Sequence, residues 1–230
     1  MTPRDDLPGG CVKQEVRQER AEDHEAVREV HTQAFSDSER VPTLVDALRA
    51  ARTPLAPLSL VAIVGERVVG HVMLSACRLD ALPRLVDVMS LSPLGVLPEF
   101  QRQGIGTRLV AHALAGADSR GIPLVFLEGS PHYYGKRGFA DATKLGFRPP
   151  TLRYPPGAFQ VAKLSSYEEW MTGTFVYSDA FWVLDCVGLR GERLETAAPR
   201  AGSGRHRSAE GVREDRDRPA GRGQRGPARR

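Results

Sequence analysis

What the sequence lacks excludes several classes of protein. Its 230 residues include 3 cysteines, Cys11, Cys77 and Cys186, which are too few and too far apart for a disulfide framework or a cysteine metal site. The longest apolar run, over residues 58–64, falls far short of the roughly 18 to 20 residues that cross a bilayer. The first ten residues lack the basic start and apolar middle of a secretory signal. We therefore expect a cytoplasmic protein with no membrane association and no metal.

Charge is unevenly distributed along the chain. The formal net charge is +4, but residues 191–230 alone hold 11 arginines against 6 acidic residues. This segment contains no Phe, Trp, Tyr or Ile, so it cannot bury enough apolar surface to offset the entropy of ordering it. We expect a disordered Arg/Gly-rich tail over 191–230. An arm that binds nucleic acid is the alternative, but the interspersed acidic residues and the missing aromatic side chains make nucleic acid an unexpected partner.

The remainder of the chain alternates between helical and strand periodicity. Helical spacing of apolar residues predicts helices over 22–35 and 41–51 and a third after residue 106. Alternating or continuous apolar runs predict strands over 12–16, 58–64, 68–77, 88–97, 124–127 and 158–164, with short apolar segments at 174–177 and 181–189. Strand, helix and strand between residues 88 and 127 form a right-handed βαβ unit with two parallel strands. This order predicts an α/β fold, a mixed sheet with helices on both faces.

A glycine-containing loop joins a predicted strand to a predicted helix at Gln101 to Gly106, Q-R-Q-G-I-G. Unpaired backbone N–H groups and the positive end of the helix dipole can hold a phosphate at such a place. A Walker loop would need Gly-Lys-Ser/Thr, and a dinucleotide fingerprint would need glycine where Leu109 stands. Both common nucleotide-binding loops are thus excluded. The loop either binds another kind of anion or is a tight turn that binds no ligand.

Two motifs in this order of elements carry a family resemblance. Gln101, Gly104 and Gly106 match Arg/Gln-x-x-Gly-x-Gly/Ala, and P-H-Y-Y-G-K-R-G-F matches Tyr-x-x-x-Gly-Phe with the tyrosine at Tyr134. From about Val12 to Leu164 the chain resembles the GNAT superfamily of acetyl-CoA-dependent N-acetyltransferases. The resemblance implies a mostly antiparallel mixed sheet with a central parallel pair. It also implies direct transfer of acetyl from acetyl-CoA to a primary amine of a small molecule or peptide.

Three segments follow from this interpretation. Residues 11–164 are predicted to form the acetyltransferase domain, 165–190 an aromatic-rich extension packed on it, and 191–230 the tail. We expect Trp170, Trp182 and their aromatic neighbours to pack in the core or in a dimer rather than to line a substrate site. The sequence does not decide the oligomeric state, and a homodimer is one alternative because dimers are common in the family that the chain resembles.

The cofactor would be held mainly by backbone groups. Coenzyme A pyrophosphate is expected on the N–H groups of Arg102 to Thr107, with the Arg102 side chain as an added positive charge. Pro93 favours a bulge that frees the neighbouring backbone to pair with the pantetheine amides, where the family resemblance places a divergence of two strands. The predicted cofactor-binding set is Leu94, Gly95, Val96, Gln101, Arg102, Gln103, Gly104, Ile105, Gly106 and Thr107.

Acetyl transfer needs an acid for the departing thiolate and a base for the amine. Tyr134 matches the family tyrosine that faces the sulfur and is predicted as the acid, with Tyr133 as the competitor. Glu128 is the candidate base because it follows a buried strand near the expected divergence, and Asp87 and His132 are its alternatives.

We expect the remaining histidines and the cysteines to have structural rather than catalytic roles. His24, His31, His71 and His112 show no metal-ligand spacing and are predicted at the surface or satisfied in the core. The cysteines are predicted as small buried residues.

Two other functions compete with acetyl transfer. One is a catalytically silent acyl-CoA-binding module on the same fold, and the other is a nucleic-acid-associated protein recruited by the basic tail. The sequence leaves the acceptor amine and the range of acyl groups open.

Overall fold

The computed structural model describes residues 14–36 and 39–190, and these form one eight-stranded mixed sheet. Seven strands follow the order β1-β2-β3-β4-β5-β7-β6, and β8 pairs with the last residues of β3, beyond the start of β2. The pairing of β4 with β5 is parallel, and the other neighbours are antiparallel. The strands are β1 (Gln14–Gln18), β2 (Leu58–Val64), β3 (Arg67–Ala81), β4 (Leu85–Val96), β5 (Leu124–Glu128), β6 (Ala140–Asp141), β7 (Phe159–Lys163) and β8 (Gly173–Val176).

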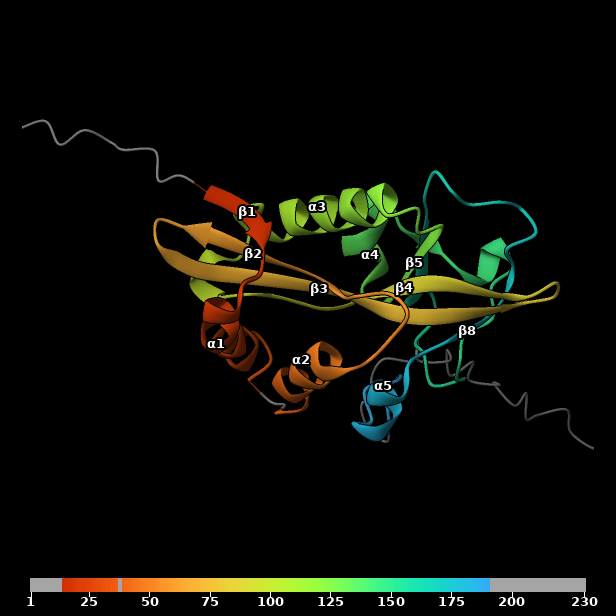
Figure 1. The fold of residues 1–230 in the computed structure, drawn as a ribbon, viewed down its shortest axis with the longest axis horizontal. Helices are drawn as coiled ribbons and strands as arrows, with labels where there is room; N and C mark the ends of the chain where they lie inside the picture. Colours follow the sequence, from red (N-terminus) through yellow and green to blue (C-terminus); the bar gives the residue numbers. More distant parts are fainter. Residues whose placement is uncertain (1–13, 37–38, 191–230) are drawn as a thin grey trace, which may run out of the picture. The chain divides into compact units, whose positions relative to one another are not determined.

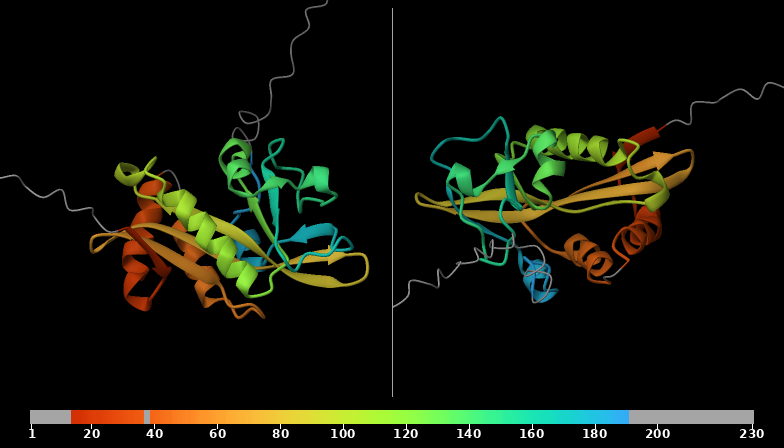
Figure 2. Two further views of the ribbon diagram at one scale, coloured as in Figure 1. Left: turned by 90° about the horizontal axis from the view of Figure 1, so that it is seen from above. Right: turned by 180° about the vertical axis from the view of Figure 1, so that it is seen from behind.

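Helices cover both faces of this sheet. Helix α3 (Ile105–Ser119) lies on one face, and α1 (His24–Ala34) and α2 (Arg40–Ala50) lie on the other (Figures 1 and 2). Apolar residues at helical spacing on α3, including Leu109 and Ala113, are completely buried against the strands. The shorter helices are α4 (Pro131–Tyr134) and α5 (Asp179–Val183), with 3-10 turns η1 (Ala21–Asp23), η2 (Pro98–Phe100), η3 (Gly135–Arg137) and η4 (Thr143–Leu145).

The parallel strands β4 and β5 diverge soon after they meet. Their register consists of Met89 opposite Val125 and Ser90 opposite Phe126. On the other edge of β4, Leu91 pairs with Leu74 but Leu94 pairs with Val72, so two residues of β4, Ser92 and Pro93, stand opposite one residue of β3. This is a β-bulge, which bends the bulged strand and ends regular pairing. The backbone beyond the bulge is therefore separated from β5, as the Pro93 pattern predicted.

Most predicted elements are present, with corrections at their ends. Strand β3 continues four residues past the predicted end at 77, because its pairing with β4 extends to Asp80 and β8 pairs with its last residues. The predicted helix over 22–35 is divided into η1 and α1. Of the apolar segment 181–189, the first residues belong to α5. The predicted tail over 191–230 and Cys11 lie outside the described residues.

Aromatic rings from β5, β7, β8 and the segment after β8 pack together in the core. The ring of Phe126 on β5 lies 4.5 Å from that of Phe175 on β8 and 5.6 Å from that of Phe159 on β7, measured between centroids. Tyr177 and Phe181 continue this cluster and are almost fully buried. Trp182, in contrast, is 41% exposed. The core interpretation therefore holds for the phenylalanines and Tyr177 but not for Trp182.

Two histidines are buried between α1 and the sheet. His31 and His71 are 0% exposed, and His31 Nε2 lies 2.7 Å from His71 Nδ1. Burial lowers the pKa of His31 to about 3, and it also lowers the pKa of His71, because a cation in the core loses its hydration. Both rings are neutral at physiological pH. Both lie in the core, which was one of the two predicted placements. The prediction that their polar atoms are satisfied holds for His71 but not for His31, whose Nδ1 has no hydrogen-bond partner among the described residues.

These histidines make the fold sensitive to acid. The unfolded chain binds protons on both rings below about pH 6.5, whereas the folded chain does not do so until about pH 3 for His31. We predict that the free energy of unfolding falls more steeply between pH 6.5 and 4.5 in the wild type than in His31→Leu. Urea denaturation at several pH values checks this. The exposed-site variant His112→Gln should keep the wild-type slope, and parallel curves for His31→Leu and wild type would contradict the assignment.

Candidate functional site

A cavity of about 610 Å³ lies beside the loop at the start of α3. We call it the loop cavity. Arg102 and Gly104 have left-handed backbone conformations, with φ of 61° and 80°. For an arginine this conformation is uncommon and marks a backbone held by its surroundings. From the set predicted to bind the cofactor, the residues that line the loop cavity are Leu94, Val96, Gln101, Arg102, Gly104, Ile105, Gly106 and Thr107.

A cation and a tyrosine face the same loop from α4 and the turn after it. The Arg137 guanidinium donates to Thr107 Oγ1 through Nη2 at 2.6 Å and lies 3.6 Å from the centroid of the Tyr133 ring. The Tyr133 hydroxyl occupies the space beside Gly106, where a Cβ atom would come within 2.4 Å of it. Glycine at 106 therefore permits close approach to the first turn of α3. The loop cavity combines helix N–H groups with a fixed positive charge, which suits a phosphate ligand.

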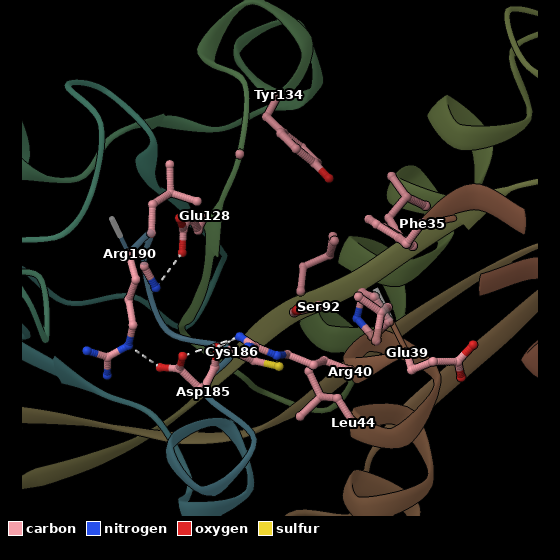
Figure 3. Close-up of a pocket in the computed structure, with 17 residues that line it drawn as sticks. Phe35, Glu39, Arg40, Leu44, Ser92, Glu128, Tyr134, Asp185, Cys186 and Arg190 are labelled. Carbon is pink, nitrogen blue, oxygen red and sulfur yellow. Dashed lines mark hydrogen bonds and ion pairs between the residues drawn. The ribbon is translucent and has the colours of Figure 1, made fainter. Parts of the chain in front are cut away.

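A larger cavity of about 970 Å³ opens where β4 and β5 diverge, and we call it the cleft. Its walls are Phe35 and the start of α2, residues 91–94 of β4, the end of β5, and residues 185–190 (Figure 3). Tyr134 lines both the cleft and the loop cavity, as does Leu94. A ligand could therefore occupy both cavities at once past these two residues.

Tyr134 points its hydroxyl into the cleft (Figure 3). Its ring packs against Gly129, where a Cβ atom would lie 2.4 Å from the ring, and edge-on against Phe139 at 5.7 Å between centroids. Burial raises the pKa of Tyr134 above its usual value of 10, and the neighbouring Tyr133 adds to this shift. The phenol is therefore protonated at neutral pH and can donate a proton.

Glu128 ends β5 and lines the cleft two residues beyond the last β4–β5 pair. Its Oε2 accepts a hydrogen bond from the Gly188 backbone N–H at 3.0 Å. Burial raises the pKa of Glu128 to about 7, although the Gly188 hydrogen bond and the charge of Arg153 oppose the shift. A carboxyl group with this pKa exchanges protons readily near neutral pH.

The two alternative bases lie elsewhere. Asp87 on β4 forms an ion pair with Arg78, and His132 is an exposed residue of α4. Neither lines the cleft or the loop cavity. Among the three candidates, Glu128 is the one that the structure brings to Tyr134.

The register of β4 determines which backbone groups face the divergence. Leu97 N–H donates to Val69 O, so this antiparallel pair is hydrogen-bonded, and alternation along the ladder makes Gly95 opposite His71 the next hydrogen-bonded pair. Leu94 and Val96 therefore turn their N–H and C=O groups away from β3, and Gln101 Nε2 donates to Val96 O at 3.0 Å. Two residues of the predicted cofactor-binding set do not line the loop cavity. Gly95 faces α1, and the side chain of Gln103 donates to Glu99 O.

The family model described as "Acetyltransferase (GNAT) domain" matches residues 15–142, more than half of the chain. The chain belongs to the GNAT acetyltransferase family. A curated relative, the Uncharacterized N-acetyltransferase YjhQ of Escherichia coli K12, is 32% identical over 113 residues. That match spans 49% of this chain and 62% of the relative.

Solved GNAT structures share the fold. The GNAT family N-acetyltransferase YhbS of Escherichia coli, in complex with CoA, superposes with a TM-score of 0.66 at 25% identity and covers 76% of this chain and 96% of YhbS. A GNAT acetyltransferase of Brucella melitensis, in complex with acetyl-CoA, gives a TM-score of 0.60 at 29% identity, over 74% of this chain and 99% of the other. The GNAT fold expected from the resemblance is confirmed.

Several residues in the walls of the two cavities were not singled out from the sequence. Arg137 stands inside the tyrosine motif, but its contact with Thr107 depends on the folded turn. Asp185 has a left-handed φ of 51° and accepts from Arg190 Nε at 2.5 Å in the wall of the cleft. Cys186, predicted as buried, is half-buried in the same wall, because the chain after α5 forms the rim of the cleft. No sequence pattern indicates these last two placements.

Two kinds of feature are absent from the described residues. Within residues 14–36 and 39–190, no group of three or more His, Cys, Asp or Glu side chains is arranged to hold a metal ion. Over the same residues, no helix is both long enough and apolar enough to span a membrane.

The raised pKa of Glu128 has a consequence for stability. Because the folded chain favours the neutral carboxyl, this stabilisation is complete below about pH 4.5 and is lost as the pH rises through about 7. We predict that thermal denaturation midpoints of wild type and Glu128→Gln, which keeps an acceptor for the Gly188 N–H, move apart between pH 5 and 8 as the wild type loses stability. A constant difference over this range would show that Glu128 is ionised throughout.

Proposed function

We propose that this protein transfers the acetyl group of acetyl-CoA to a primary amine. The observation that carries the proposal is that the loop cavity and the cleft lie next to each other, with Tyr134 and Leu94 lining both. One end of this space suits phosphates, and the other presents a protonated phenol and a carboxyl group of pKa about 7. The CoA and acetyl-CoA complexes of the two similar GNAT structures support acetyl-CoA as the donor.

The donor would be held by backbone groups and one cation. The pyrophosphate would accept from the N–H groups of Arg102 to Thr107, with Arg137 as an additional donor. The pantetheine amides would pair with Leu94 and Val96, whose backbone groups face the divergence, as an added strand pairs with a sheet edge. The Leu94 N–H would then donate to the oxyanion that develops on the thioester.

The acceptor would enter through the cleft. Its ammonium group must lose a proton before attack, and Glu128, which lines the cleft, would accept it. The amine then attacks the thioester carbonyl directly, and Tyr134 protonates the departing thiolate. A covalent acetyl-cysteine is disfavoured for Cys186, because burial raises the pKa of its thiol.

Binding of acetyl-CoA tests the loop cavity. We predict that isothermal titration of the full chain shows binding, and that Gly106→Val weakens it at least about tenfold, because its side chain fills the space at the start of α3. Arg137→Gln should weaken binding by about 10- to 100-fold, the effect of losing a hydrogen bond from a charged group.

Gly135→Ala is the matched control for these variants, since a Cβ atom there meets nothing within 4 Å. It should bind like the wild type, and circular dichroism should show all three variants folded. Equal affinity in Gly106→Val and wild type would contradict the assignment of the loop cavity.

Measurements of turnover test the proposed roles of the cleft residues. They also distinguish an enzyme from a catalytically silent acyl-CoA-binding module. Thiol release from acetyl-CoA is measured with kanamycin, spermidine, lysine and alanylalanine as acceptors. For any amine accepted, we predict that Tyr134→Phe lowers kcat about 10²-fold with little change in the KM for acetyl-CoA. In the wild type kcat should rise with pH through about 7, and Glu128→Gln should lack this inflection.

Tight binding of acetyl-CoA without thiol release to any amine would favour the silent module. An unchanged pH profile in Glu128→Gln would assign the proton to another group. Wild-type kcat in Tyr134→Phe would exclude the phenol as the acid.

A further inference from the structure

A chain of hydrogen-bonded polar side chains, two buried histidines, the half-buried Ser59 and a carboxylate, runs from α1 through β3 and β2, outside the loop cavity and the cleft. His31 Nε2 lies 2.7 Å from His71 Nδ1, and His71 Nε2 lies 2.7 Å from Ser59 Oγ. Ser59 Oγ donates to Glu19 Oε2 at 2.5 Å, and Glu19 also forms an ion pair with Arg49. Both histidines are 0% exposed, and the side chain of Glu19 is 4% exposed. We call His31, His71, Ser59 and Glu19 the histidine relay.

The ion pair at one end fixes the direction of every hydrogen bond. Glu19, paired with Arg49, is a carboxylate that can only accept, so the Ser59 hydroxyl donates to it. Ser59 Oγ then accepts from His71 Nε2–H, which leaves His71 Nδ1 as an acceptor for His31 Nε2–H. Because both rings are neutral, the remaining nitrogen, His31 Nδ1, carries a lone pair.

This lone pair lies just behind the wall of the cleft, beside Gly95 and next to Phe35, because His31 itself does not line the cleft. His31 Nδ1 is buried and has no hydrogen-bond partner in the described part of the chain. It is 2.8 Å from the position of a Cβ atom on Gly95, in the segment of β4 that diverges from β5. The His31 ring stacks on Phe35, which lines the cleft, with 5.9 Å between centroids. A buried acceptor without a partner is costly, so its place beside the site calls for an explanation.

We propose that the histidine relay takes up a proton from the attacking amine after the new C–N bond has formed, and later returns it to the active site. This inference rests on the acetyl transfer proposed above. Because His31 does not line the cleft, the proton would reach its Nδ1 through one bridging water between Gly95 and Phe35.

Each transfer in the relay breaks one bond to hydrogen and forms another. The tetrahedral adduct carries a cationic nitrogen, and its proton moves to His31 Nδ1. The Nε2 proton of His31 moves to His71 Nδ1, the Nε2 proton of His71 moves to Ser59 Oγ, and the Ser59 hydroxyl proton moves to Glu19. The end state is a neutral carboxylic acid and two imidazoles of the opposite tautomer.

The return path uses the same atoms in reverse order. Tyr134 has by then protonated the CoA thiolate and is a phenolate, and the proton that comes back from His31 Nδ1 restores the phenol. One proton leaves the nitrogen and one reaches the sulfur, so this stage needs no exchange with solvent. The ammonium proton that Glu128 takes before attack is released separately.

The surroundings of the relay favour tautomer exchange over a stable imidazolium. Burial and the charge of Arg49 lower the pKa values of both histidines, so neither ring holds an extra proton. The charged and titratable groups near the relay are Arg49 and its second partner Asp46 on α2, and His24 on α1. In the relay each ring gains and loses a proton in one transfer and stays neutral.

The tautomers are tested without any acetyl acceptor. The full chain, labelled with ¹⁵N-histidine, is examined by long-range ¹H–¹⁵N correlation spectra at pH 7. His31 and His71 should each carry their proton on Nε2 and remain neutral down to pH 5. A proton on Nδ1 of His31, or a cationic ring at pH 7, would overturn the relay.

The transfer itself is tested by kinetics with the acceptors named above. Ser59→Ala breaks the relay and should lower kcat at least about tenfold, with the KM for acetyl-CoA unchanged. Ser59→Thr keeps the hydroxyl and should restore kcat to within about threefold of the wild type. The proton inventory of kcat in mixtures of H₂O and D₂O should be curved for the wild type, since several protons move, and linear for Ser59→Ala.

Ser75→Ala is the control for loss of a buried strand hydroxyl, because Ser75 Oγ is buried on β3 and is not part of the relay. It should retain wild-type kcat. Equal kcat in Ser59→Ala and wild type, or an equal loss in Ser59→Thr, would overturn the proposal. If no amine is accepted although acetyl-CoA binds, the proposed function fails, and the tautomer spectra still decide whether the relay has the required direction.

Discussion

The divergence of β4 from β5 is the constraint on which the rest of the site depends. Two parallel strands that pair at Met89 and Ser90 would ordinarily continue to pair, but the bulge at Ser92 and Pro93 bends β4 away. The separation turns backbone groups of Leu94 and Val96 toward the opening, where Val96 O accepts from Gln101 Nε2. Polar backbone groups away from water need partners, and the amides of a ligand could supply them for the groups that remain.

Short contacts at glycines bring the chemistry to this opening. Gly129 gives room to the ring of Tyr134, Gly106 to the hydroxyl of Tyr133, and Gly95 to the imidazole of His31. Each contact would be blocked by a methyl group on the glycine. The loop cavity at the start of α3 suits an anion, and the ionisable Tyr134 and Glu128 lie in the cleft beside it.

The fold could be predicted from the sequence to the extent that local pattern determines it. Apolar periodicity located the helices and strands, and the loop Gln101 to Gly106 with the Tyr134 motif indicated the cofactor end. The extension of β3 to Ala81 was missed because it depends on pairing with β8, nearly a hundred residues away. The relay of His31, His71 and Ser59 was missed for the same reason, since three elements must come together before their side chains meet. The pKa of Glu128 follows from burial, which no spacing reveals.

The most direct measurement is a crystal structure of the full chain with acetyl-CoA. Our account predicts the pyrophosphate on the loop at the start of α3, the pantetheine between β4 and β5 with its amides on the backbone of Leu94 and Val96, and the thioester beside Tyr134. Acetyl-CoA bound outside the divergence, or β4 and β5 paired beyond Ser90 with no room for it, would contradict the account.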